Sequence, residues 1–194
     1  MTASSFPVNL NLSGKACLAL GEGPELLARV RALLDAGAKV EVVSEHPDQA
    51  LRELGRAGSI RLSERAFDAA DLEDKWLCVL VGTEPARARR IAEAAERARV
   101  LFCATDAPVP DLFSHMALAR AGSLVIATAS GGHAPALARR LREELQRLLD
   151  ECGMASFVDG LAELRRRTPS SDRRRVLGEA VAPLHFTGKI VVPK

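Results

Sequence analysis

The feature that most constrains the fold is a short apolar run that stops at a glycine turn and continues into a helical pattern. Residues 16–20 (ACLAL) are apolar, Gly21-Glu22-Gly23 follows, and Pro24 opens a stretch with leucine and valine at helical spacing. Proline suits the first helical position because its φ is already set and its missing N–H has no partner to lose. Strand, glycine turn and helix in this order are typical of dinucleotide-binding folds, because small residues let backbone N–H groups approach a pyrophosphate.

An acidic residue further along supports this interpretation, although the glycine pattern is incomplete. Gly21 and Gly23 match the first two glycines of G-x-G-x-x-G, while Leu26 stands where the third would pack helix on strand. Glu45 follows the next apolar run, residues 39–43, where a carboxylate accepts hydrogen bonds from the ribose hydroxyls of NAD. Because a carboxylate would repel the 2′-phosphate of NADP, we expect NAD. An ordinary βα turn and a solvated strand end are the alternative interpretations.

Strand and helix patterns alternate along the first half of the chain. Helices are expected from Pro47 and Pro85, and further strands over residues 59–62, 76–81 and 100–104. This alternation predicts an α/β fold, a Rossmann-type parallel sheet with right-handed crossovers.

Ligands of such sheets bind beyond the carboxyl ends of the strands. The predicted sheet therefore brings four segments of the chain to one rim, namely Gly21–Gly23, Glu45, Gly82–Thr83 and Asp106.

The pattern changes after Asp106. Residues 112–118 and 124–128 flank a turn and predict a strand hairpin, although local propensity also allows a helix over 116–120. An amphipathic helix begins at Pro135. A hairpin with one helix is too small to fold alone, so we expect it to pair with a second subunit. The predicted organisation is a Rossmann domain (1–112), an appended dimerisation domain (113–150) and a small helical tail (151–194).

Composition and charge narrow the class of protein. A net charge of +2 over 194 residues argues against a general nucleic-acid binder, and no apolar run reaches the length of a membrane span. Without the basic and apolar regions of a signal peptide at its start, the chain is expected to be cytoplasmic. The single cysteines (Cys17, Cys78, Cys103 and Cys152) suit neither a zinc site nor a disulfide framework and indicate buried thiols.

Several of these segments, taken in order, carry a resemblance to a known family. They are NLNLSGKACLALGEG, LLDAGAKVEVV, WLCVLVGT, FCATDAP and SGGHAPALARRLREEL. Together they resemble the precorrin-2 dehydrogenases, which occur as stand-alone enzymes and as the N-terminal module of siroheme synthases. The likeness covers residues 8–150, and its most specific parts are Asp106-Ala107-Pro108 and residues 130–139.

The resemblance implies NAD-dependent oxidation of precorrin-2 to sirohydrochlorin by a homodimer, and some members of the family also insert ferrous iron to give sirohaem. The family's catalytic aspartate matches Asp106, which would take a proton or orient the ring. The expected cofactor contacts are Gly21, Gly23, Pro24, Glu25, Glu45, His46, Gly82 and Thr83. The expected substrate contacts are His115, Arg120, Ser130, Gly131 and Arg139, with no resident metal. Ser130 matches a serine that is phosphorylated in some members, and arginines would offset the carboxylates of the tetrapyrrole. The arginines of 165–167 and 173–175 form either a solvated helical face or part of that anion site.

Departures from the family pattern keep other functions open. Glu22 replaces the middle residue of the family's Gly-Gly-Gly turn, and Leu26 replaces a small residue. One alternative is a tetrapyrrole carrier or sensor that no longer oxidises its ligand. Another is a chelatase, which needs a macrocycle site and a proton acceptor but no dinucleotide.

Overall fold

The computed structural model describes residues 6–105, 109 and 111–187. These residues fall into two compact units, which divide between His115 and Met116. The first unit contains a parallel sheet covered by helices, and the second contains a β-hairpin and helices. The predicted α/β fold class is thereby confirmed.

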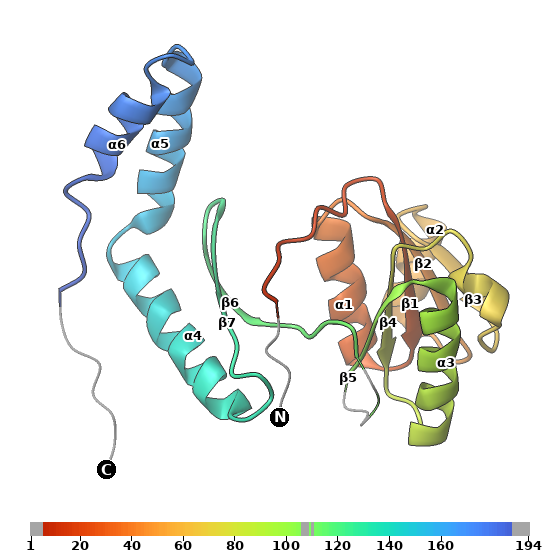
Figure 1. Cartoon of the computed structure of the whole chain (residues 1–194). Coiled ribbons are helices and arrows are strands. Elements are labelled where there is room, and N and C mark those ends of the chain that lie inside the picture. The colour runs from red at the N-terminus through yellow and green to blue at the C-terminus, as the bar shows by residue number, and fades with distance from the viewer. Residues whose placement is uncertain (1–5, 106–108, 110, 188–194) are drawn as a thin grey trace. The chain divides into compact units, whose positions relative to one another are not determined.

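The sheet of the first unit has five parallel strands in the order β3-β2-β1-β4-β5 (Figure 1). All five residues of β4, LCVLV, are buried, as the continuous apolar run of a central parallel strand requires. The strands are β1 (Ala16–Gly21), β2 (Lys39–Ser44), β3 (Arg61–Glu64), β4 (Leu77–Val81) and β5 (Leu101–Thr105).

Helices cover both faces of this sheet. α1 (Pro24–Asp35) and α2 (Gln49–Arg56) bury Leu26, Val30 and Leu51 against one face. α3 (Pro85–Ala98) and the 3₁₀ turn η1 (Ala69–Leu72) bury Ile91 and Leu72 against the other. Figure 1 shows α1 and α3 on opposite sides of the strands. The core therefore lies in two apolar layers, one on each side of the sheet.

The turns after β1 and β4 press against each other. Gly21 lies opposite Val81 in the strand register, and a Cβ on Gly21 would stand 1.8 Å from the Val81 carbonyl oxygen. In the next turn, a Cβ on Gly82 would lie 3.4 Å from the Glu22 carbonyl oxygen. Glycine at position 21 is thus required by both space and its φ of 119°.

Two elements of the first unit begin later than predicted. α2 begins at Gln49, because the Asp48 carboxylate caps the helix by accepting a hydrogen bond from the Leu51 N–H at 2.8 Å. β3 lies two residues later than predicted, at Arg61–Glu64. Its end residues form exposed ion pairs with neighbouring elements, Arg61 with Glu41 at 3.4 Å and Glu64 with Arg52 at 3.0 Å.

The acidic connection before β4 is a tight capped turn. The Asp68 carboxylate accepts from the Ala70 N–H, and the Asp71 carboxylate accepts from the Asp68 N–H, both at 2.9 Å. Arg65 donates two hydrogen bonds to Asp71, at 2.6 and 2.9 Å, and these lower the pKa of that carboxyl. The turn places Phe67 at the start of the crossover from β3 to β4.

The second unit contains the predicted hairpin, but its first strand begins later than expected. β6 (Ala117–Ala121) pairs antiparallel with β7 (Leu124–Thr128), while residues 112–115 form no strand. The helices that follow are α4 (Pro135–Glu151), α5 (Met154–Arg167) and α6 (Arg173–Val181). The Gln146 side chain of α4 both donates to and accepts from the backbone of Arg120 at 2.9 Å. This pair of bonds fastens the hairpin to the helix.

Only one face of the hairpin is covered within the described chain. Ala119 and Ala121 are buried against α4, together with Leu149. Side chains alternate along a strand, so Leu118 and Val125 lie on the other face. They are 39% and 44% exposed. This apolar face is available to a partner.

Three of the four thiols are buried as predicted, whereas Cys152 is exposed. Burial raises the pKa of Cys103 to about 11 and that of Cys78 still further. Within the described ranges, no helix has the length and apolar character needed to cross a membrane. The apolar run at 190–192 lies outside the described residues.

Replacing Gly21 with alanine should destabilise the first unit by at least about 3 kcal/mol, because the new Cβ would overlap the Val81 carbonyl. Gly58→Ala is the matched control, since Gly58 also has a positive φ (70°) but faces open space. We expect this control to cost about 1–2 kcal/mol. Urea unfolding of both variants measures the difference. Equal costs would contradict the close approach of the two turns.

Candidate functional site

A small pocket lies at the carboxyl ends of β1, β2 and β4, beside the start of α3. Leu20, Val43, Phe67, Leu80 and Ile91 form its apolar lining, and its other lining residues are Gly21, Glu22, Ser44, Glu45, Gly82, Thr83 and Arg87. Four of the residues predicted to contact a cofactor, from three separate strand ends, thus line one pocket. Their role in binding stays a prediction.

The amino terminus of α1 adjoins this rim and has the form of an anion site. Gly23 is the N-cap residue, with a φ of 84°, and no side chain caps the helix. A Cβ on Gly23 would meet nothing within 4 Å, so the space above the turn is open. Pro24 occupies the first helical position, and Glu25 pairs with Arg29 at 2.5 Å. Uncapped N–H groups at the positive end of a helix dipole favour a phosphate.

Leu26 stands where the motif has its third glycine, and its side chain fits into the core between α1 and the sheet. Its side chain is fully buried among the residues that join α1 to the sheet. Leucine in place of the third glycine therefore contributes to helix–sheet packing and does not change the turn at Gly21 and Gly23.

Ser44 lines the pocket and has a buried hydroxyl without a hydrogen-bond partner among the described residues. The residue is 3% exposed. Buried hydroxyls normally have a partner, because a lone one loses its hydration without compensation. A polar ligand group would supply that partner once the lining shifts enough to reach the Oγ atom, which is closed to solvent in this structure.

An ion pair narrows the same pocket. Glu45 follows β2, and its Oε1 lies 2.6 Å from Nη1 of Arg87 in the first turn of α3. The cavity that remains has a volume of about 40 Å³, enough for about one water molecule. A nucleotide would therefore require the walls of the pocket, including this ion pair, to shift.

The other predicted residues of the first unit that the structure describes do not line this pocket. His46 is exposed beside Glu45. The predicted catalytic residue, Asp106, lies outside the described residues. His115 stacks edge-on with Phe113, with ring centroids 5.5 Å apart. Desolvation, aided by the charge of Arg29, lowers the pKa of His115.

The remaining substrate candidates belong to the second unit. The Ser130 hydroxyl accepts a hydrogen bond from the Ala134 N–H at 3.1 Å, just before α4. Gly131 has a φ of 60° in the same turn. Arg120 lies on the uncovered face of the hairpin, and Arg139 is exposed on α4. In the part of the chain that the structure describes, no group of three or more His, Cys, Asp or Glu side chains is placed to hold a metal.

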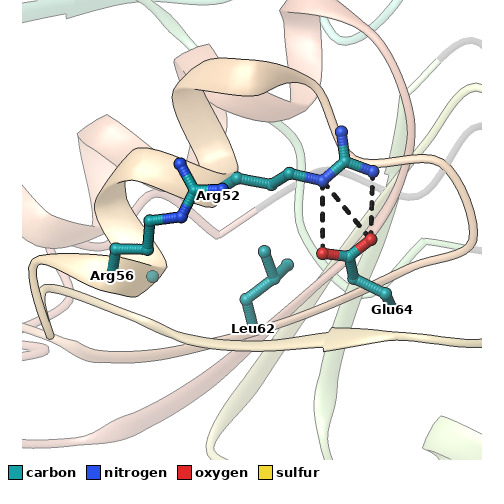
Figure 2. A pocket seen from close by; sticks show the side chains of 5 residues that line it. Arg52, Arg56, Leu62 and Glu64 are labelled. Carbon is teal, nitrogen blue, oxygen red and sulfur yellow. Dashed lines mark hydrogen bonds and ion pairs between the residues drawn. The ribbon is translucent and has the colours of Figure 1, made fainter.

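A second depression, between α2 and β3, has a structural explanation. Figure 2 shows the Arg52 side chain extending along α2 to the Glu64 carboxylate, above Leu62. Arg52 donates three hydrogen bonds of 3.0 to 3.3 Å to Glu64 and lowers its pKa. The two charges satisfy each other and clamp the edge strand to the helix.

A third cavity, of about 450 Å³, lies between α3 and β5 and is lined mainly by apolar surface around Phe102 and Leu112. At its wall Asp111 accepts a hydrogen bond from the Ala104 N–H at 2.8 Å, and burial raises its pKa. The backbone N–H of Leu112 donates to the Phe102 carbonyl oxygen at 2.9 Å. These two bonds join Asp111 and Leu112 to the backbone of β5.

Sequence reasoning missed Ser44, Phe67 and Arg87, which line the pocket with the predicted residues. Ser44 could have been found, because it directly follows the predicted buried strand over residues 39–43 and precedes Glu45. Arg87 is one of several arginines in its helix, and no local signal distinguishes it from Arg89 or Arg90.

Comparison with known proteins assigns the family. A family model described as putative NAD(P)-binding matches residues 8–114, more than half of the chain. Siroheme synthase 2 of Cronobacter sakazakii is 33% identical over 175 residues, and siroheme synthase 1 of Aeromonas salmonicida is 34% identical over 177. The chain belongs to the family of siroheme synthase N-terminal modules and precorrin-2 dehydrogenases.

The matches differ in how much of each relative they cover. They span 88% and 90% of this chain but only 38% of either siroheme synthase. A solved structure described as SirC, precorrin-2 dehydrogenase, superposes with a TM-score of 0.75 at 20% identity, covering 91% of this chain and 89% of that one. This likeness shows a shared fold, and the family contains an NAD(P)-binding domain.

Removing the charge of Glu22 should strengthen dinucleotide binding. The side chain lines the pocket beside the turn expected to face the pyrophosphate, so we expect Glu22→Gln to bind NAD about two- to fivefold more tightly at low salt. Glu73→Gln, an exposed change away from the pocket, is the control. Isothermal titration calorimetry gives both affinities. Weaker binding by the Glu22 variant would show that the carboxylate assists the cofactor.

Proposed function

We propose that the protein oxidises precorrin-2 to sirohydrochlorin with NAD as the oxidant. The observation that carries the proposal is the pocket itself, where the turn at Gly21, the carboxylate of Glu45 and the unpartnered hydroxyl of Ser44 meet. When bound, NAD accepts the hydride. The residues of this chain hold the dinucleotide and orient the macrocycle.

Glu45 supports NAD over NADP. Its carboxylate can accept hydrogen bonds from ribose hydroxyls, whereas a 2′-phosphate would place like charges together. With Glu22 in the same lining, the pocket has two acidic side chains and one arginine. This balance disfavours an additional phosphate.

Asp106 is the proposed catalytic residue. It directly follows Thr105, the last residue of β5, whose neighbour in the register is Val81 at the end of β4. A carboxylate after this strand end would belong to the rim that carries the cofactor pocket. There it would take the proton that leaves the macrocycle or orient the ring.

The proposed substrate site draws on arginines of the second unit. Arg120 lies on the uncovered face of the hairpin and Arg139 on the exposed surface of α4. Guanidinium groups form charge-assisted hydrogen bonds with carboxylates, which precorrin-2 carries around its ring. Ser130 and Gly131, just before α4, and His115 complete the proposed contacts.

A homodimer completes the proposal, because Leu118 and Val125 lie beside Arg120 on a hairpin face that is uncovered in the described chain. Leu118→Lys should therefore weaken association at least about tenfold by placing a charge in the subunit contact. Leu10→Lys is a matched control, since Leu10 is also 39% exposed but lies in the first unit. Sedimentation velocity over a range of concentrations measures the dimer fraction. A monomeric wild type would contradict the dimer.

The activity is tested by anaerobic incubation with precorrin-2 and NAD, following NADH and the visible spectrum together. We expect stoichiometric NADH with sirohydrochlorin, and a loss of about 10²- to 10⁴-fold in kcat for Asp106→Ala. NAD affinity and thermal unfolding of this variant should match wild type. Turnover by Asp106→Ala at the wild-type rate would contradict the catalytic role.

A second candidate function rests on Glu22 and on the small size of the pocket. A protein that bound tetrapyrrole without dinucleotide would act as a carrier or sensor, or as a chelatase with ferrous iron as a substrate. In the same assay, a bound-tetrapyrrole spectrum without NADH would favour this candidate. Iron insertion into sirohydrochlorin without NAD would then identify the chelatase.

A further inference from the structure

The pocket lining contains one cationic side chain, Arg87, and two acidic side chains, Glu45 and Glu22. Arg87 lies 2.6 Å from Glu45, and Glu22 lines the same pocket. With one positive and two negative side chains, the described lining carries one negative charge in excess. The positive charge of Arg87 therefore determines how strongly this lining attracts or repels a further anion.

The two side chains of this ion pair can be replaced without disturbing the fold. The side chains of Arg87 and Glu45 are 42% and 38% exposed. Ion pairs at such exposure are screened by water and contribute little to stability. Neither side chain is a core residue, so both can be replaced while the sheet and α3 stay folded.

The two side chains respond in opposite ways to the 2′ position of an adenosine ribose. Glu45 Oε1 is held by Arg87, which leaves Oε2 free to accept from a hydroxyl. A 2′-phosphate would be repelled by Glu45 but attracted by the guanidinium, which binds phosphate through paired donors. While the Glu45 carboxylate is paired with the Arg87 guanidinium, it offsets the attraction between that guanidinium and a 2′-phosphate.

We infer that Arg87 determines how strongly the site discriminates between NAD and NADP, with Glu45 holding its guanidinium away from the phosphate. The inference rests on the proposed function, because it requires the adenosine end of a dinucleotide in this pocket. It adds a specificity-determining residue from α3 to the expected acidic residue after β2.

Calorimetric titration of NAD and NADP into the full chain and four variants tests the inference. Wild type should prefer NAD by about tenfold or more. Glu45→Gln should bind NADP about tenfold more tightly than wild type, because the guanidinium is released. Adding Arg87→Gln to this variant should abolish that gain. Arg87→Gln alone should weaken NADP binding further, while the exposed control Arg90→Gln should change neither affinity by more than about twofold.

The outcomes separate this inference from the proposed function. If the double variant binds NADP as tightly as Glu45→Gln, or if Glu45→Gln gains no NADP affinity, the role of Arg87 is wrong. Wild-type NADH formation would still support the dehydrogenase in that case. If wild type binds neither dinucleotide, both the inference and the proposed function are overturned. Thermal unfolding of each variant checks that the fold is retained.

Discussion

The rest of the first unit depends on the close contact between the ends of β1 and β4. Gly21 has no room for a Cβ beneath the Val81 carbonyl, and Gly82 approaches the backbone of Glu22. This contact lets the two central strands end at the same level, with their turns against each other. The pocket, the start of α1 and the start of α3 are all positioned by it. A larger residue at position 21 would separate these parts.

Much of the fold could be predicted because apolar periodicity dominates the central elements. β1 and β4 are buried on both faces, so their sequences are continuous apolar runs. At the edge of the sheet, β3 is only partly buried, and its position is set by backbone pairing with β2. Its sequence, RLSE, contains no apolar run to mark it, and the predicted strand was two residues early.

The candidate site also contains residues that the sequence predicted and residues that it missed. Gly21, Glu45 and Gly82 could be predicted to meet because each follows a strand of a parallel sheet, and such strands end at a common rim. Arg87 was missed because its partner, Glu45, lies far from it in the sequence, on the other side of β3 and β4. Its partner is therefore set by tertiary structure. The role of Asp106 still rests on the resemblance to the family.

The most direct test of the central claim is a crystal structure of the protein with NAD bound. We expect the adenosine ribose against Glu45, a hydrogen-bond partner for Ser44 Oγ, and Glu45 still paired with Arg87 through one carboxylate oxygen. The pyrophosphate should lie at the turn of Gly21 and Gly23. NAD bound away from this pocket, with Ser44 Oγ still without a partner, would contradict this binding site.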